Sequence, residues 1–162
     1  MSERELKMIL STPEAVALVT HSRELERVIV FTNGVFDVLH PGHVRYLRDA
    51  KALGHVLIIG INSDRSARTL GKAPNRPINP EHERAELLSA LASVDAVVVF
   101  DEETPHAIIS ALQPDILVKG ADWGVTAIVG RDVVEARGGH VVRIPLASGY
   151  STTAILDKIK LQ

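Results

Sequence analysis

The chain has no cysteine, few aromatic residues and no long apolar run. The absence of cysteine excludes disulfides, thiolate metal sites and cysteine nucleophiles. No apolar stretch approaches the roughly 20 residues of a membrane helix, and the first ten residues lack the sustained apolar region of a signal peptide. The formal net charge is only -2, with Lys and Arg scattered along the chain, so no nucleic-acid-binding surface is expected. These absences predict a cytoplasmic protein without membrane or nucleic-acid partners.

Apolar runs alternate with helical patterns along most of the chain. The runs expected to form strands are 28–31, 56–61, 96–100, 116–118 and 141–144. The segments expected to form helices are 43–53, 80–91, 105–112, 131–137 and 152–160. This alternation predicts an α/β fold, a Rossmann-like doubly wound, five-stranded parallel sheet with helices on both faces.

The length of 162 residues, 46% of them apolar, suits a single core. Residues 1–27 are expected to form an N-terminal helical extension whose packing face is Ala15, Leu18 and Val19. The remaining residues, 28–162, are expected to form the main domain. In an open parallel sheet, ligands bind beyond the carboxyl ends of the strands, so the turn after Phe31 is the natural place for a site.

That turn carries the most informative motif of the chain, which runs from Thr32 to His43. A buried strand ends at Gly34, and an apolar stripe indicates a helix that begins near His43. The free N–H groups and the dipole at a helix start attract anions, and Gly42 leaves room for a ligand to approach the backbone. His40 and His43 are spaced so that both rings can face one pocket, and phosphate oxygens are the expected guests.

Two other interpretations of the histidines stay open. One or both rings could merely cap the helix or pack against it. Asp37 could also join His40 and His43 as the third ligand of a transition metal. No further cluster of potential ligands adjoins the motif in sequence, which disfavours the metal site.

A second element is the basic segment 65–78, which carries Arg65, Arg68, Lys72 and Arg76 between glycine and proline breakers. Its reach and charge indicate a mobile loop that closes over phosphates, although a solvated connection would look similar. Asn79 can cap the next helix with Pro80 at its first position. Arg84 then lies one turn inside that helix, where it could also be a surface ion-pair partner.

A third element, 148–154, places the hydroxyls of Ser151, Thr152 and Thr153 at the start of the last expected helix. Its buried stripe is expected to be Ile155, Leu156 and Ile159. Helix capping alone would explain one or two of these hydroxyls, but a second anion site is also possible. Lys119, Gly120, Asp122 and Trp123 follow the fourth expected strand, again at a carboxyl end. Trp123 could instead be an ordinary packed tryptophan.

The segment GVFDVLHPGH resembles the GxFDxxHxGH signature of the small nucleotidyltransferases. The similarity continues through RPINPEHER, VKGADW and GYSTT, and spans about residues 28–159. The opening Thr-Asn-Gly, RPINPE and GYSTT look most like the heptose 1-phosphate adenylyltransferases. Cytidylyltransferases of this superfamily carry Arg and Glu in an RTExxST version of the last motif, where this chain has Leu146 and Ser148.

The resemblance implies a role for each matching residue. The catalytic residues would be His40, His43, Lys72 and Arg84. The nucleotide-binding residues would be Thr32, Asn33, Gly34, Phe36, Gly42, Lys119, Ser151, Thr152 and Thr153. Weaker candidates for substrate contacts are Asp37, Asp64, Asp122 and Trp123. Mg²⁺ is expected as cofactor, bound mainly through the ATP phosphates, and no residue is assigned as a metal ligand.

The implied activity is transfer of AMP from ATP to D-glycero-β-D-manno-heptose 1-phosphate, which gives ADP-heptose for surface polysaccharide and pyrophosphate. A separate sugar kinase would supply the sugar phosphate, and a homodimer is common among such proteins. Two other functions stay open, a cytidylyltransferase acting on glycerol 3-phosphate or another polyol phosphate, and a nucleotide sensor without turnover. A dehydrogenase is disfavoured, because the first turn lacks GxGxxG.

Overall fold

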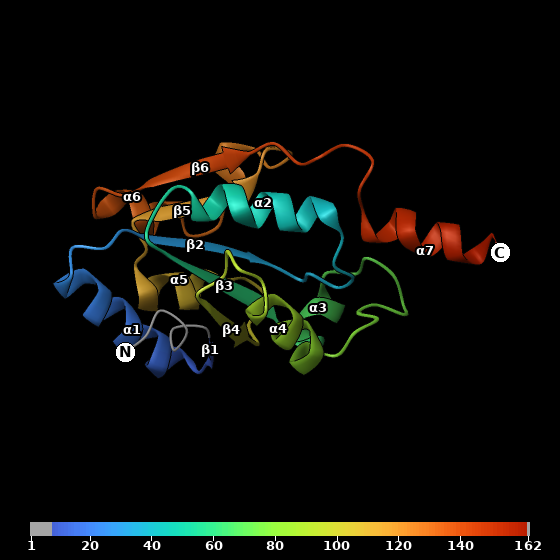
Figure 1. The fold of residues 1–162 in the computed structure, drawn as a ribbon, viewed down its shortest axis with the longest axis horizontal. Coiled ribbons are helices and arrows are strands. Elements are labelled where there is room, and N and C mark those ends of the chain that lie inside the picture. The colour runs from blue at the N-terminus through green and yellow to red at the C-terminus, as the bar shows by residue number, and fades with distance from the viewer. Residues whose placement is uncertain (1–7, 162) are drawn as a thin grey trace.

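The computed structural model describes residues 8–161, which form a six-stranded sheet covered by helices (Figure 1). The strands are β1 (Met8–Leu10), β2 (Ile29–Gly34), β3 (Val56–Asn62), β4 (Ala96–Phe100), β5 (Ile116–Gly120) and β6 (His140–Ile144). The helices are α1 (Thr12–Glu24), α2 (Pro41–Lys51), α3 (Asp64–Thr69), α4 (Glu81–Ser89), α5 (His106–Leu112), α6 (Arg131–Ala136) and α7 (Thr152–Lys160), with a 3-10 turn η2 (Val125–Ala127). None of the helices within residues 8–161 is long and apolar enough to cross a membrane.

Helices cover both faces of the sheet, so the doubly wound α/β architecture expected from the sequence is confirmed. One core joins the sheet to α1, α5 and α6, through residues such as Val19, Ile109 and Val134. The other joins it to α2 and α4, through residues such as Leu47 and Leu88. β3 is buried along its entire length, as expected of a strand between two helical layers.

All pairings in the sheet are parallel, and the strand order is β1-β4-β3-β2-β5-β6. The chain moves outward from β2 through β3 to β4, then returns to place β5 on the other side of β2. The order therefore reverses between β2 and β5, where Thr32 pairs with Val118. This reversal opens a crevice at the carboxyl ends of these two strands.

The prediction of five strands was wrong by one. The segment expected to be only helical contains β1, which pairs with β4 and adds an edge strand. Three residues are too few to show a strand periodicity in the sequence. The expected helix follows as α1, with Ala15 and Val19 buried and Leu18 packed against the core. Residues 8–24 thus share the sheet and core with the rest of the chain.

Two local predictions were also wrong. The first part of the basic segment, expected as a loop, is helix α3, which Ser63 caps by accepting a hydrogen bond from the N–H of Ser66. Asn79 does not cap α4, whose N-cap residue is Pro80. The Asn79 side chain instead donates to the carbonyl oxygen of Asp37.

Helix α7 has the bounds predicted from the sequence but extends away from the sheet (Figure 1). The stripe expected to be buried is only partly so, because Ile155 and Leu156 are half-buried and Ile159 is 63% exposed. The start of α7 is anchored to the body, since Thr152 Oγ1 donates to the carbonyl oxygen of Val38.

Candidate active site

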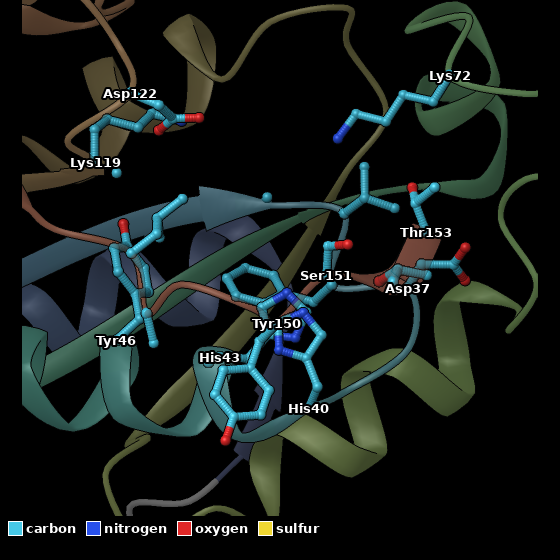
Figure 2. A pocket seen from close by; sticks show the side chains of 18 of the residues that line it. Asp37, His40, His43, Tyr46, Lys72, Lys119, Asp122, Tyr150, Ser151 and Thr153 are labelled. Atoms are coloured by element: carbon cyan, nitrogen blue, oxygen red, sulfur yellow. The ribbon is translucent and has the colours of Figure 1, made fainter. Parts of the chain in front are cut away.

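A cavity of about 570 Å³ lies at the crevice between β2 and β5 and brings four of the sequence elements together (Figure 2). It receives side chains from the turn after β2, the start of α2, the segment after α3, the end of β5 and the start of α7. The predicted site residues that line it are Asn33, Gly34, Phe36, Asp37, His40, Gly42, His43, Lys72, Lys119, Asp122, Trp123, Ser151, Thr152 and Thr153. Residues more than 100 positions apart thus share one pocket.

The two histidines stack on each other at the start of α2. Their ring centroids are 3.8 Å apart and their planes differ by 21°. The helix begins at Pro41, two residues earlier than predicted, and His40 is its N-cap without a side-chain hydrogen bond to the helix. The interpretation that the His40 side chain caps the helix is therefore not supported, and the ring lines the cavity instead.

Burial lowers the pKa of His43 to about 4, and the positive charges of His40 and Lys72 add to the effect. Burial also lowers the pKa of His40. Both rings are therefore neutral at pH 7 in the ligand-free protein. A neutral imidazole still has one N–H to donate to a phosphate oxygen. An anion bound beside the two rings would raise both pKa values.

Several buried polar atoms around this pocket lack a hydrogen-bond partner within the described part of the chain. They are Nδ1 of His40, Nδ1 of His43 and Oδ1 of Asn33. Unpaired buried polar atoms are uncommon in folded proteins, and water or a ligand usually satisfies them. Their gathering at one cavity marks it as a binding site.

Gly42 allows His40 and Tyr150 to pack closely against the start of α2. A Cβ atom at this position would lie 2.9 Å from Nδ1 of His40 and 3.0 Å from Cβ of Tyr150. Phe36 lies in the turn between β2 and α2 and has a φ of 50°, a left-handed conformation that is rare for a bulky residue. Its ring lies 5.2 Å from that of His43. Backbone conformations of this kind concentrate at functional sites.

Asp37 anchors the segment that carries Lys72. Its side chain is 1% exposed, pairs with Arg76, and accepts hydrogen bonds from the backbone N–H groups of Ile78 and Asn79. These contacts hold the end of the segment against the turn after β2. Lys72 itself is exposed and reaches toward the histidines from the opposite side of the pocket (Figure 2).

Arg84 does not line the cavity, and its side chain is fully buried. It donates to the carbonyl oxygens of Val35 and Asn79 and to the carboxylate of Asp64. These contacts tie both ends of the Lys72 segment to the turn after β2. The predicted contact of Arg84 with phosphate stays a prediction, as does the predicted substrate contact of Asp64.

Thr32 is also buried and absent from the cavity wall, and it hydrogen-bonds Tyr46 and the carbonyl oxygen of Val118. Its predicted contact with nucleotide stays a prediction. Thr32 reaches the pocket only through the Tyr46 side chain.

The end of the cavity beside β5 has a different character. Nζ of Lys119 lies 5.6 Å from the ring centroid of Trp123, whose indole is half exposed rather than packed in a core. Burial lowers the pKa of Lys119 to about 8; nearby Asp122 opposes this shift and Lys72 adds to it. Asp122 turns back over Gly120, where a Cβ would lie 2.6 Å from Oδ1 of Asp122.

The sequence analysis missed several residues of the cavity wall. They are Val35, Tyr46, Leu146, Ala147 and Tyr150. Arg76 and Gly120 also line the cavity, and they belong to the basic segment and to the strand end that the sequence had indicated. Tyr46 follows His43 by three positions on the same helix, so helical spacing could have placed it on the pocket face. The ring of Tyr150 is parallel to that of His40, with ring centroids 6.2 Å apart. The guanidinium of Arg45 lies over the Tyr150 ring, with Cζ 5.2 Å from the ring centroid. Nothing in the sequence signals that pairing.

Within residues 8–161, no group of three His, Asp or Glu side chains is placed to hold a metal ion. Asp37, the third ligand of the alternative metal site, is engaged by Arg76 and two backbone N–H groups. The geometry therefore disfavours a transition-metal site at the histidines.

Comparison with known proteins agrees with this geometry. Residues 31–157 match the model of the family described as cytidylyltransferase-like. The chain belongs to that family. The D-beta-D-heptose 1-phosphate adenylyltransferase of Bordetella bronchiseptica is 48% identical over 98% of both chains. The resemblance to heptose 1-phosphate adenylyltransferases expected from the motifs is thereby confirmed.

Longer relatives and a solved structure extend the comparison. The bifunctional protein HldE of Mesorhizobium japonicum is 51% identical over 94% of this chain, which matches only 30% of that protein. The chain thus spans about a third of the length of such relatives. A crystal structure of the lipopolysaccharide core biosynthesis protein of Thermoplasma volcanium superposes with a TM-score of 0.66 and 31% identity, covering 75% of this chain and 99% of that one.

Proposed function

We propose that this cytidylyltransferase-like protein transfers AMP from ATP to D-glycero-β-D-manno-heptose 1-phosphate, giving ADP-heptose and pyrophosphate. The observation that carries the proposal is the stacked His40–His43 pair at the start of α2, facing Lys72 and the hydroxyls of Ser151 and Thr153 across one cavity. N–H groups, an ammonium and hydroxyls are donors that suit a chain of phosphates. The choice of ATP and heptose 1-phosphate is supported by the Bordetella bronchiseptica relative.

In this reaction a phosphate oxygen of the sugar phosphate attacks the α-phosphorus of ATP. The bond from that phosphorus to the bridging oxygen of pyrophosphate breaks, and pyrophosphate leaves with the electron pair. No general base is needed, because the second pKa of a phosphate monoester is near 6 and the nucleophile is already ionised at pH 7. The protein's work is to bring two anions together and to stabilise charge on the α-phosphate and leaving group.

We assign that electrostatic work to His40, His43 and Lys72, with Ser151 and Thr153 supporting the phosphates. Arg84 and Asp37 fix the segment that carries Lys72. These residues are assigned to the phosphates and not to a metal. They are therefore compatible with Mg²⁺ that would be bound mainly by the ATP phosphates and water, as this ion prefers. When bound, it would neutralise charge on the phosphates.

The proposed substrate must come from a reaction that phosphorylates the anomeric oxygen of the sugar, which is the work of a sugar kinase. We also infer a homodimer. Apolar residues at the end of α7 support this inference, because Ile159 and the C-cap residue Leu161 are 63% and 87% exposed where the helix extends from the body.

The test follows pyrophosphate release with Mg²⁺ and each of ATP, CTP, GTP and UTP, paired with heptose 1-phosphate or glycerol 3-phosphate, with mass detection of the product. ADP-heptose formed from ATP is the expected result. CTP with glycerol 3-phosphate as the active pair would make the protein a cytidylyltransferase. ATP binding without pyrophosphate release in any pair would favour a sensor.

Matched variants connect this activity to the pocket. His43→Ala and Lys72→Ala should each lower kcat by about 10²- to 10³-fold, the usual effect of removing one transition-state donor, with little change in stability. His82→Ala and Arg48→Ala remove an exposed histidine and an exposed cation outside the cavity wall, and should leave kcat unchanged. Near-normal kcat in both pocket variants would refute the assignment.

A further inference from the structure

The hydroxyl of Tyr46 donates its proton to a hydrogen bond within the protein. Oγ1 of Thr32 donates to the carbonyl oxygen of Val118 at 3.0 Å. A threonine hydroxyl has one proton, so the 2.8 Å contact between the hydroxyls of Tyr46 and Thr32 requires Tyr46 to donate. The Tyr46 oxygen therefore has only lone pairs left, and toward a ligand it acts solely as an acceptor.

The fold fixes this arrangement. Thr32 and Val118 are partners in the register between β2 and β5, the two strands that flank the crevice. Tyr46 lies on α2 and is 8% exposed, yet it lines the cavity. Burial raises the pKa of Tyr46 to about 12, and the nearby charge of Asp122 adds to the rise, so the phenol stays protonated at physiological pH.

Tyr46 lies at the end of the cavity where Lys119 and Asp122 are found, away from Lys72 (Figure 2). This end offers acceptors, from Tyr46 and the Asp122 carboxylate, and a donor, the Lys119 ammonium. Ionised phosphate oxygens only accept, so they cannot bond to a Tyr46 oxygen that also only accepts. Hydroxyl groups both donate and accept, and they fit this mixed set.

We propose that Tyr46 is a specificity-determining residue whose oxygen accepts a hydrogen bond from a hydroxyl group of a bound substrate, either the ribose of the nucleotide or the sugar of the sugar phosphate. The identity of these substrates rests on the proposed function. A substrate that lacks this hydroxyl leaves the buried Tyr46 oxygen unpaired, and a site built to bond a hydroxyl rejects the deoxy analogue for that reason.

The test is a binding measurement, so it does not depend on turnover. Calorimetry compares ATP, 2′-deoxy-ATP and 3′-deoxy-ATP on the full chain and on Tyr46→Phe, which keeps the ring and removes the hydroxyl. A second titration measures heptose 1-phosphate in the presence of α,β-methylene-ATP. Tyr150→Phe is the matched control, because Tyr150 is the other tyrosine of the chain and also lines the cavity.

If the hydroxyl belongs to the ribose, one deoxy analogue should bind the unmodified protein about 2- to 12-fold more weakly than ATP, the range for one neutral hydrogen bond. That ratio should fall to about 1 in Tyr46→Phe and persist in Tyr150→Phe. If it belongs to the sugar, Tyr46→Phe should weaken the binding of heptose 1-phosphate by a similar factor and leave the affinities for ATP and for both deoxy analogues unchanged.

A general structural defect would weaken all ligands alike without changing the ratios. Unchanged deoxy ratios together with unchanged heptose 1-phosphate binding in Tyr46→Phe would overturn the assignment of Tyr46. Absence of turnover alongside the expected binding pattern would overturn the proposed function alone.

Discussion

We expect kcat/KM for ATP to fall as the pH rises through about 8, because Lys119 loses its proton there. Burial is the main reason that the pKa of Lys119 is lowered to about 8. Lys119 lines the cavity, and we expect its protonated form to attract the triphosphate. The sign follows directly: the favourable charge is present below pH 8 and is lost above it.

The magnitude follows from the fraction of Lys119 that is protonated in the free enzyme, which kcat/KM reports. With a pKa of about 8, only about one tenth of the lysine is charged at pH 9, so kcat/KM should be about tenfold below its plateau. An unperturbed lysine, with a pKa near 10.4, would leave the value nearly unchanged at pH 9. The substrate phosphates are fully ionised above pH 8 and do not contribute a second transition.

The assay measures initial rates of pyrophosphate release between pH 7 and 9.5 for the unmodified protein, Lys119→Arg and Lys119→Met. Arg stays charged throughout this range, so Lys119→Arg should give a flat profile, and Lys119→Met should give a low, flat one. A flat profile for the unmodified protein, or a decline that survives in Lys119→Arg, would refute the reasoning.

Arg84→Lys should lower the free energy of unfolding by about 3 kcal/mol, because an ammonium cannot keep the hydrogen bonds of the guanidinium to three protein acceptors. Urea unfolding tests this, and intact stability with lost turnover would instead place Arg84 on the substrate. Asp37→Asn breaks a buried ion pair and should cost about 3 kcal/mol while weakening ATP binding in calorimetry, since the Lys72 segment loses its anchor; full ATP affinity would contradict that link. Ile159→Glu should convert a homodimer to a monomer in analytical ultracentrifugation, and a monomeric unmodified protein would contradict the inference from α7.

The fold class could be predicted from the sequence because its signals are local. Strands buried on both faces appear as continuous apolar runs, and 96–100 and 152–160 were predicted with the bounds that the structure gives to β4 and α7. The edge strand β1 could not be predicted, since three residues acquire strand geometry only by pairing with β4. The same limit applies to α7, whose apolar stripe predicted burial although the helix extends from the body.

The sequence by itself determined the local features of the candidate site, because helix starts, glycine turns and the His40–His43 spacing are local patterns. The tertiary structure decided which of these groups meet. It placed Lys72 and Ser151 in the same cavity as the histidines, and put Arg84 behind the cavity wall as a support. It also set the acceptor role of Tyr46, which depends on the hydrogen bonds from Tyr46 on α2 to Thr32 on β2 and from Thr32 to the carbonyl oxygen of Val118 on β5. Parallel strands distant in sequence end at one edge of a sheet, so only the order of the strands determines which side chains share a pocket.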